Sequence, residues 1–194
     1  MPPLCLHMVA APPDTPPPGF RYVPDFITAA EEANLMAATR ALEFSDVVMR
    51  GQTARRRVAH FGWRYGYESF AVTPGPPLPP AFLPLRRRVA DLIQVEDEAL
   101  AELLVTAYPP GAGIGWHRDA PAFDTVVGVS LLSPCRFRFQ RGEGAARRTR
   151  MVVLDPRSAY VLAGEARWQW QHTIPAMKVE RHSLTFRTLS RRGR

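Results

Sequence analysis

The C-terminal half of the chain, from residue 103 onward, consists of short apolar runs that restrict the folds open to it. The runs are LLVTAY, TVVGVSLL, RFRFQ, RMVVLD, AYVLAG, ARWQWQH and SLTFRTL, and glycine, proline or aspartate separates them. Several short strands rich in β-branched and aromatic residues at this spacing are typical of a β-sandwich or jelly roll. We therefore predict an α+β protein with a double-stranded β-helix (jelly-roll) core.

The N-terminal half predicts helices ahead of this core. Residues 28–43 begin with Thr28 and carry Glu31 three residues later, which is the arrangement of a capping box. Apolar residues recur at helical spacing over 80–94, so a second helix is expected there. A short acidic helix is expected over 95–102.

The whole pattern fits a single domain over residues 20–190, because 194 residues suffice for one core. Seven of the 20 prolines fall in the first 18 residues, so we expect residues 1–19 to form a flexible arm. Residues 191–194 are expected to form a basic tail. The two cysteines, Cys5 and Cys135, predict no disulfide framework, and without a run of 18 apolar residues no membrane span is expected. A reduced cytoplasmic setting fits this pattern, and we expect a monomer.

One short motif, GWHRDAP, carries the first sign of chemistry. His117 and Asp119 are separated by one residue, and on extended backbone two such side chains face the same side. With a second histidine they would form a two-histidine, one-carboxylate set, which suits non-haem Fe(II) in oxygenases. The candidates for that second histidine are His7, His60, His172 and His182. A polar turn without metal is the alternative, since H-x-D also occurs by chance.

Two further features suit a carboxylate ligand. In RHSLTFR, Arg181 and Arg187 fall on one face of a predicted strand, and arginine forks bind carboxylates through two hydrogen bonds. A short dicarboxylate could fit between them, although a solvated basic strand face is the alternative. Tyr108 ends an apolar strand nine residues before His117 and offers a phenol donor.

Taken together, these parts resemble the AlkB family of Fe(II)/2-oxoglutarate dioxygenases over about residues 60–189. The resemblance rests on YPPGAGIGWHRD, GEARWQWQHTIP and RHSLTFR, in this order. It implies that the Fe(II) ligands and catalytic residues are His117, Asp119 and His172. It also implies that the residues binding the cosubstrate 2-oxoglutarate are Arg181, Arg187, Tyr108, Thr106 and Ser183.

The chain departs from the family pattern at a few of these positions. Thr106 stands where an asparagine is frequent, and Ser183 stands where some members have one. Both can still form hydrogen bonds. Ala120 and Pro121 follow the metal aspartate where some members carry an acidic residue that reads the base, so the choice of base stays open.

Residues 45–80 lack a helical period and mix arginines with aromatic residues, as in MRGQTARRRVAHFGWRYGYESF. Arginines hold phosphates and aromatic rings stack on bases. By the resemblance, this segment is a lid of loops and short strands over the substrate. The substrate-binding residues it implies are Trp63, Arg57, Arg64 and Tyr65. An ordinary aromatic hairpin with solvated arginines is the alternative.

The resemblance implies an O2-dependent oxidative demethylase or dealkylase of alkylated bases in nucleic acid, with DNA repair its commonest role. The net charge of +7 agrees with a polyanionic partner, and we expect DNA rather than RNA. The first alternative is the same oxygenase chemistry on tRNA bases or on a protein side chain. The second is a cupin-like protein that binds nucleic acid without catalysis.

Overall fold

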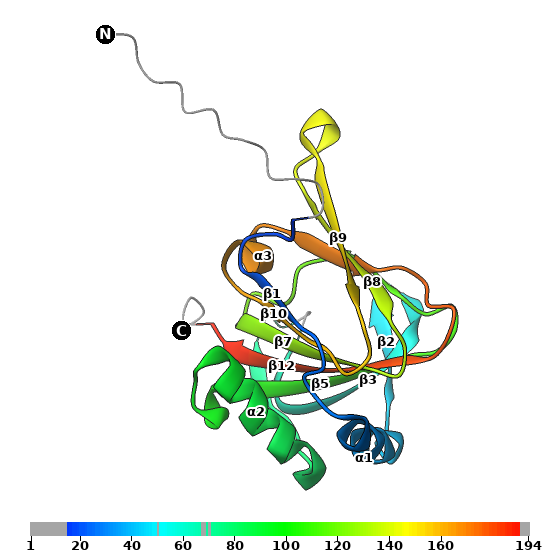
Figure 1. Ribbon diagram of the computed structural model, residues 1–194, viewed down its shortest axis with the longest axis vertical. Helices are drawn as coiled ribbons and strands as arrows, with labels where there is room; N and C mark the ends of the chain where they lie inside the picture. The colour runs from blue at the N-terminus through cyan, green and yellow to red at the C-terminus, as the bar shows by residue number, and fades with distance from the viewer. Residues whose placement is uncertain (1–14, 50, 67–68, 70, 191–194) are drawn as a thin grey trace.

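Two antiparallel sheets face each other in the computed structural model, with helices against the outer side of the larger sheet (Figure 1). The structure describes residues 15–49, 51–66, 69 and 71–190. The predicted basic tail and most of the predicted arm lie outside these residues. Within them, no helix combines the length and apolar character needed to cross a membrane.

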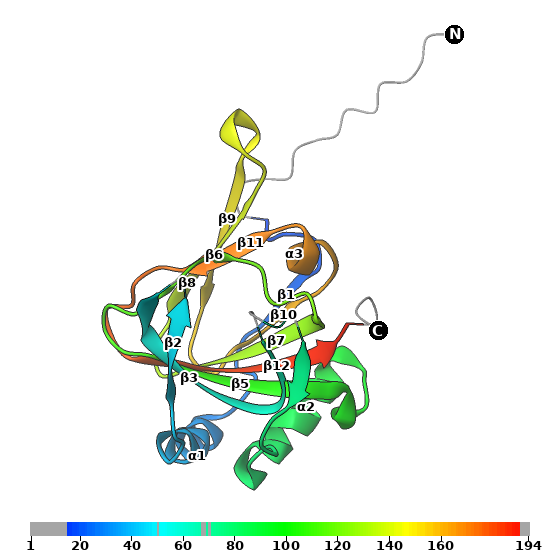
Figure 2. The ribbon, with the colours of Figure 1, turned by 180° about the vertical axis from the view of Figure 1, so that it is seen from behind.

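The larger sheet contains eight strands, and all its pairings are antiparallel. Its strands run in the order β1 (Phe20–Val23), β10 (Ala159–Leu162), β7 (Phe123–Leu131), β12 (Arg181–Leu189), β5 (Leu100–Tyr108), β3 (Gln52–Tyr65) and β2 (Ser45–Met49), with β4 (Val72–Pro74) paired to β3. The smaller sheet has the order β6 (Ile114–His117), β11 (Gln171–Ile174), β8 (Cys135–Arg141) and β9 (Arg148–Leu154). Figure 2 shows the smaller sheet facing β7, β12 and β5.

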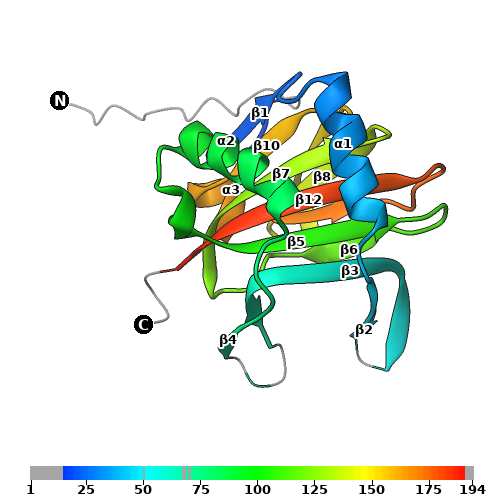
Figure 3. The same cartoon turned by 90° about the horizontal axis from the view of Figure 1, so that it is seen from below.

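Helices α1 (Ala29–Arg40) and α2 (Leu83–Ile93) lie across the outer face of the larger sheet (Figure 3). The predicted capping box is present, because the Thr28 side chain accepts from the Glu31 backbone N–H while the Glu31 carboxylate accepts from the Thr28 backbone N–H. Helix α2 follows a 3-10 turn, η1 (Pro80–Phe82), so the predicted helix over 80–94 is confirmed. Its buried residues pack with those of β5, β7 and β12 in one core cluster.

The predicted acidic helix over 95–102 is wrong. Only a 3-10 turn, η2 (Asp97–Ala99), occurs there, and β5 already begins at Leu100. The segment has too few apolar residues at helical spacing to pack a helix, whereas strand pairing with β12 and β3 buries Leu103 and Val105 under the two helices.

The predicted strand ARWQWQH is also partly wrong, because its first half is a short helix, α3 (Gly164–Trp168). Strand β11 begins only at Gln171. A contact distant in sequence stabilises the helix: the buried Arg167 side chain donates to the carbonyls of Ala120, Phe123 and Asp124. Local sequence carries no sign of such a contact.

Two residues of the predicted flexible arm over 1–19 are paired with the domain. The carbonyls of Pro18 and Gly19 accept hydrogen bonds from the backbone N–H groups of Ala166 and Ala163. These residues are therefore attached to the domain beside α3.

Another short turn, η3 (Gly144–Ala146), joins β8 to β9.

The segment over 45–80 is more regular than predicted. Its central part forms the 14-residue strand β3, which pairs with β5 from Arg57 to Gly62 and is flanked by β2 and β4. Because strand side chains alternate between faces, His60 faces the space between the sheets while Phe61 packs on the helix side. The same alternation in β5 and β12 decides which residues face the site.

Candidate metal and 2-oxoglutarate site

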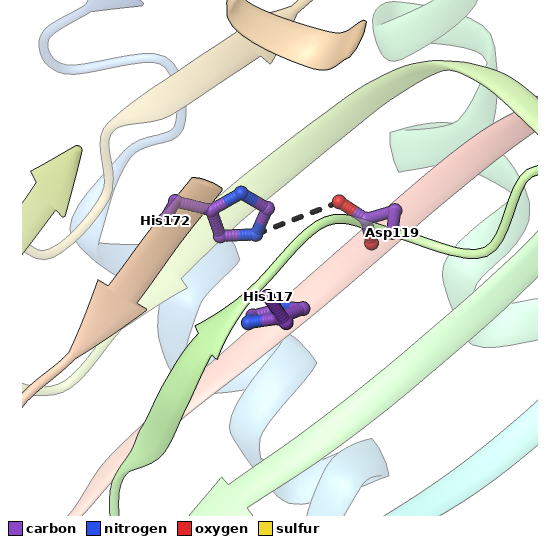
Figure 4. Close-up of side chains that lie close together, drawn as sticks. All are labelled: His117, Asp119 and His172. Carbon is purple, nitrogen blue, oxygen red and sulfur yellow. Dashed lines mark ion pairs between the residues drawn. The ribbon is translucent and has the colours of Figure 1, made fainter. Parts of the chain in front are cut away.

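Three predicted metal ligands converge between the two sheets (Figure 4). His117 ends β6, Asp119 follows two residues later, and His172 lies in β11 directly opposite His117. One ligand atom from each of the three side chains lies within 4.8 Å of the others, and His172 Nε2 is 3.5 Å from Asp119 Oδ2. This spacing suits one ion, since Fe–N and Fe–O bonds are about 2 Å long.

The protonation states of these side chains favour a cation. Burial lowers the pKa of His172 to about 3, and burial also lowers the pKa of His117. Burial alone would raise the pKa of Asp119, but the charge of Arg187, together with the charges that the two histidines carry when protonated at low pH, outweighs it and holds that pKa well below its usual range. Two neutral imidazoles and one carboxylate therefore face each other at neutral pH.

Hydrogen bonds leave the right atoms available for a metal. His117 Nδ1 lies 2.9 Å from the Gly115 carbonyl oxygen, which can only accept, so Nδ1 carries the proton and Nε2 keeps its lone pair. Asp119 Oδ2 is buried and has no hydrogen-bond partner within the described residues. The residues present therefore fit a divalent metal ion.

Arg181 provides an independent sign of a carboxylate ligand. Its side chain is fully buried, its Nε donates to Ser130 Oγ at 3.2 Å, and its guanidinium lies 5.2 Å from the centre of the Tyr108 ring. Neither terminal nitrogen, NH1 or NH2, has a hydrogen-bond partner in the described part of the chain. A buried guanidinium without an anion is costly, so this fork fits the carboxylate of 2-oxoglutarate.

Arg187, the second predicted arginine, lies on the metal side. It donates to Asp119 Oδ1 at 2.5 Å and to Glu102 Oε2 at 2.6 Å. The structure therefore places Arg187 beside the metal ligands, where its guanidinium contacts two carboxylates.

The remaining predicted cosubstrate residues line the same cavity, which has a volume of about 430 Å³. Tyr108 lies opposite Arg181, and Thr106 lies opposite Ser183, across β5 and β12. All three of Tyr108, Thr106 and Ser183 are nearly inaccessible to solvent and face the interior between the sheets. They therefore share a cavity with the metal ligands, and Tyr108 links that cavity to Arg181, whose guanidinium lies 5.2 Å from the centre of the Tyr108 ring.

The four predicted substrate residues do not lie together. Arg64 and Tyr65 line the cavity that contains the metal ligands. Trp63 does not, because it lines a separate depression beside Leu78 and Leu83. Arg57 also lies elsewhere, paired with Asp46 at 3.2 Å. Alternation along β3 accounts for Arg57, Trp63 and Arg64, since odd and even residues of one strand project to opposite faces. Tyr65, the last residue of β3, departs from this alternation and lines the cavity beside Arg64.

Sequence reasoning assigned no role to Trp116 or Glu102, and it considered His60 only as a metal ligand. Trp116 is 37% exposed at its wall, and Arg138 lies 5.7 Å from the centre of its ring. His60 and Glu102 line the cavity as well. The position of Trp116 directly before His117 on a strand was the one available signal, whereas pairing of β3 with β5 is what brings His60 to Glu102.

Comparisons with known proteins agree with this site. A family model described as the 2OG-Fe(II) oxygenase superfamily matches residues 19–193. An Arabidopsis thaliana protein named "Alkylated DNA repair protein ALKBH8 homolog" is 31% identical over 189 residues, which cover 84% of this chain and 53% of the relative. The Mus musculus "tRNA (carboxymethyluridine(34)-5-O)-methyltransferase ALKBH8" is 31% identical over 170 residues, covering 84% of this chain and 25% of the relative. The chain thus spans about half the first relative and a quarter of the second.

Solved structures confirm the predicted jelly-roll fold. The structure of OsALKBH1 superposes with a TM-score of 0.70 at 17% identity, covering 91% of this chain and all of that one. A Pseudomonas putida prolyl-4-hydroxylase superposes with a TM-score of 0.63 at 17% identity, covering 89% of this chain and 93% of the other. At such identities the likeness concerns the fold alone.

The family match and the converging side chains together identify the class of enzyme. The family uses Fe(II) and 2-oxoglutarate, and the His–Asp–His cluster fits the iron. The predicted AlkB resemblance is confirmed by the ALKBH8 relatives. The chain belongs to the 2OG-Fe(II) oxygenase superfamily, and its similarity to the ALKBH8 proteins supports the AlkB-like members as its relatives within it.

Proposed function

We propose that this dioxygenase oxidises a modified base in nucleic acid, with removal of an alkyl group from a base nitrogen of DNA as the leading reaction. The observation that carries the proposal is one cavity that contains the three metal ligands and is walled by Tyr108, against whose ring the buried Arg181 guanidinium lies. The NH1 and NH2 groups of Arg181 have no hydrogen-bond partner within the described residues. Fe(II) with 2-oxoglutarate supplies hydroxylation of a carbon by O2, and a hydroxylated N-alkyl carbon is lost as an aldehyde.

In this proposal each residue has a defined task. His117, Asp119 and His172 hold the iron. Arg181 binds the far carboxylate of 2-oxoglutarate. Tyr108, Thr106 and Ser183, along the cavity wall, contribute smaller contacts to the same cosubstrate. Arg187 neutralises Asp119 and orients it. The low exposure of this interior keeps water away from the reacting carbon.

Positive charge and an exposed ring at the cavity support a nucleic-acid substrate. Arg56 and Arg64 line the cavity with Trp116, on whose ring a base can stack. The β8–β9 hairpin adds exposed arginines that have no carboxylate partner within the described residues, namely Arg136, Arg138, Arg147 and Arg148. Phosphates match such a surface.

Oxidation of a tRNA base is the second candidate. The mouse relative is named for a tRNA uridine, whereas the Arabidopsis relative is named for alkylated DNA repair. Both substrates present a base on a phosphate backbone, so the cavity and its arginines suit either.

A substrate panel tests the proposal. The purified protein, Fe(II) and 2-oxoglutarate are incubated with methylated or etheno-modified DNA oligonucleotides, with tRNA and with a methylated peptide, and succinate and base products are quantified by mass spectrometry. Succinate formation that depends on a modified base in DNA supports the leading reaction. Succinate formation with tRNA alone supports oxidation of a tRNA base. Turnover on the peptide alone, or oligonucleotide binding that does not weaken with salt, would refute a nucleic-acid substrate.

A further inference from the structure

Glu102 is a buried carboxylate that lies outside the ligand set but contacts it through one residue. Its side chain is 1% exposed, and it projects from β5 toward the cavity. Both carboxylate oxygens are engaged: Oε2 accepts from Arg187 NH1 at 2.6 Å, and Oε1 lies 3.0 Å from His60 Nδ1. A carboxylate buried this completely is retained only when it is well paired, so its contacts indicate a role.

Arg187 connects Glu102 to the metal site. Its NH1 contacts Glu102 and its NH2 contacts Asp119 Oδ1, so one guanidinium bridges two buried carboxylates. This contact occupies Oδ1 of Asp119. It leaves Oδ2 without a hydrogen-bond partner in the described residues, on the side of His172 Nε2.

The backbone explains why Glu102 can hold this arginine in place. Glu102 and Arg187 are directly opposite each other on β5 and β12, where strand pairing fixes both main chains. A long arginine side chain has several rotatable bonds, so a single contact to Asp119 would leave its guanidinium free to rotate away. The second carboxylate, with the Phe123 ring centred 5.5 Å from the guanidinium carbon, limits that rotation.

Glu102 also balances the charge of the site. The carboxylates of Glu102 and Asp119 match the guanidiniums of Arg187 and Arg181. A divalent metal would in turn match the two negative charges of 2-oxoglutarate. Without Glu102 the Arg187 guanidinium would keep its contact to the Asp119 carboxylate but lose the second carboxylate, and burial makes a poorly compensated charge costly.

We propose that Glu102 is a positioning residue that acts through Arg187 to hold the Asp119 carboxylate with Oδ2 directed at the metal. His60 holds the other oxygen of Glu102 and completes the chain of contacts from β3 to the metal site. The proposal rests on the metal site given under the proposed function.

Metal binding without turnover tests this role. Mn(II), a spectroscopic substitute for Fe(II), is titrated into the metal-free protein and its affinity is measured by electron paramagnetic resonance. Glu102→Gln keeps the shape of the side chain but removes its charge, and we expect Mn(II) to bind about 10- to 100-fold more weakly, as is typical when partners of metal ligands are lost. Glu98→Gln is the matched control, since this exposed residue lies in the same segment and should leave the affinity unchanged.

His60 variants and a double-mutant cycle separate positioning from general destabilisation. Asparagine can replace the contact made by His60 Nδ1, so His60→Asn should bind Mn(II) more tightly than His60→Leu. In an Arg187→Gln background, Glu102→Gln should cause no further loss of affinity, because its effect passes through Arg187. Thermal melting of each metal-free variant, followed by circular dichroism, shows whether the fold is retained.

The outcomes distinguish this inference from the proposed function. If the unaltered protein binds no Mn(II), the assignment of the metal site is wrong, and the proposed role of Glu102 is rejected with it. If the unaltered protein binds Mn(II) and the folded Glu102→Gln variant binds equally well, only the positioning role is overturned. A further loss in the Arg187→Gln background also overturns it. Should Glu102→Gln fail to fold, the ranking of the two His60 variants decides, and equal affinities reject the proposal.

Discussion

His117 and His172 lie directly opposite each other on neighbouring antiparallel strands, with their ring centres 4.2 Å apart. The pairing places two neutral imidazoles beside the Asp119 carboxylate, although 55 positions in the chain separate the histidines. Two neighbouring strands of one sheet hold the two histidines, and Asp119 follows two residues after the end of β6. Removing any one of the three side chains should therefore abolish metal binding while the fold is retained.

Asp119→Ala should abolish succinate formation from 2-oxoglutarate, because only two neutral ligands would remain for the metal. Its far-ultraviolet circular dichroism should stay that of the unaltered protein. Asp91→Ala, which removes an exposed carboxylate from α2, is the control and should keep full activity. Retained Fe(II)-dependent turnover in Asp119→Ala would mean that Asp119 is not a ligand.

Arg181→Lys should raise the KM for 2-oxoglutarate about 10- to 100-fold, since loss of a charged hydrogen bond costs roughly 1.5–3 kcal/mol. Lysine keeps the positive charge but cannot form the two parallel hydrogen bonds of the fork. Steady-state kinetics with varied 2-oxoglutarate measures the change. Arg87→Lys, at an exposed position on α2, should leave this KM unchanged. An unaltered KM in Arg181→Lys would show that the far carboxylate binds elsewhere.

Two exposed tryptophans form a natural pair for testing where the substrate binds. Trp116 is 37% exposed and lines the cavity, whereas Trp63 is 39% exposed and lines a separate depression. Stacking is worth about 1–3 kcal/mol per base, so Trp116→Ala should weaken oligonucleotide binding about 5- to 150-fold. Fluorescence anisotropy measures both variants. A larger loss of affinity in Trp63→Ala than in Trp116→Ala would show that the base stacks on Trp63, as predicted from the sequence.

The metal-free protein should lose stability as the pH falls from 6.5 toward 4. Burial lowers the pKa of His172 in the folded state to about 3 from 6.5, so the unfolded chain binds a proton in this range and the folded chain does not. Proton binding therefore favours unfolding, by up to about 1.4 kcal/mol per pH unit for one histidine.

Urea unfolding of the chelator-treated protein at several pH values measures this dependence. Burial lowers the pKa of His117 as well, and its contribution has the same sign. His172→Gln removes one titrating group, so its free energy of unfolding should fall less steeply over the same range. Equal slopes for the two proteins would show that His172 is not buried in its neutral form.

The local parts of the site were predictable from the sequence. A spacing of one residue places His117 and Asp119 on one side of an extended chain, and the capping box marks the start of α1. Alternation along β12 likewise places Arg181 and Arg187 on the same face as Ser183. These features depend on backbone geometry over a few residues, which a short stretch of sequence contains.

Only the tertiary structure decided which distant residues meet. Four histidines were candidates for the third ligand, and the pairing of β11 with β6 selects His172. His182 instead lies on the helix side of β12 near Glu180, and His60 contacts Glu102; His7 lies outside the described residues. The same kind of pairing places Trp116 rather than Trp63 in the cavity and forms α3 where a strand was expected. Strand register and packing bring together segments that are far apart in the chain, so the periodicity of a short stretch of sequence cannot predict these contacts.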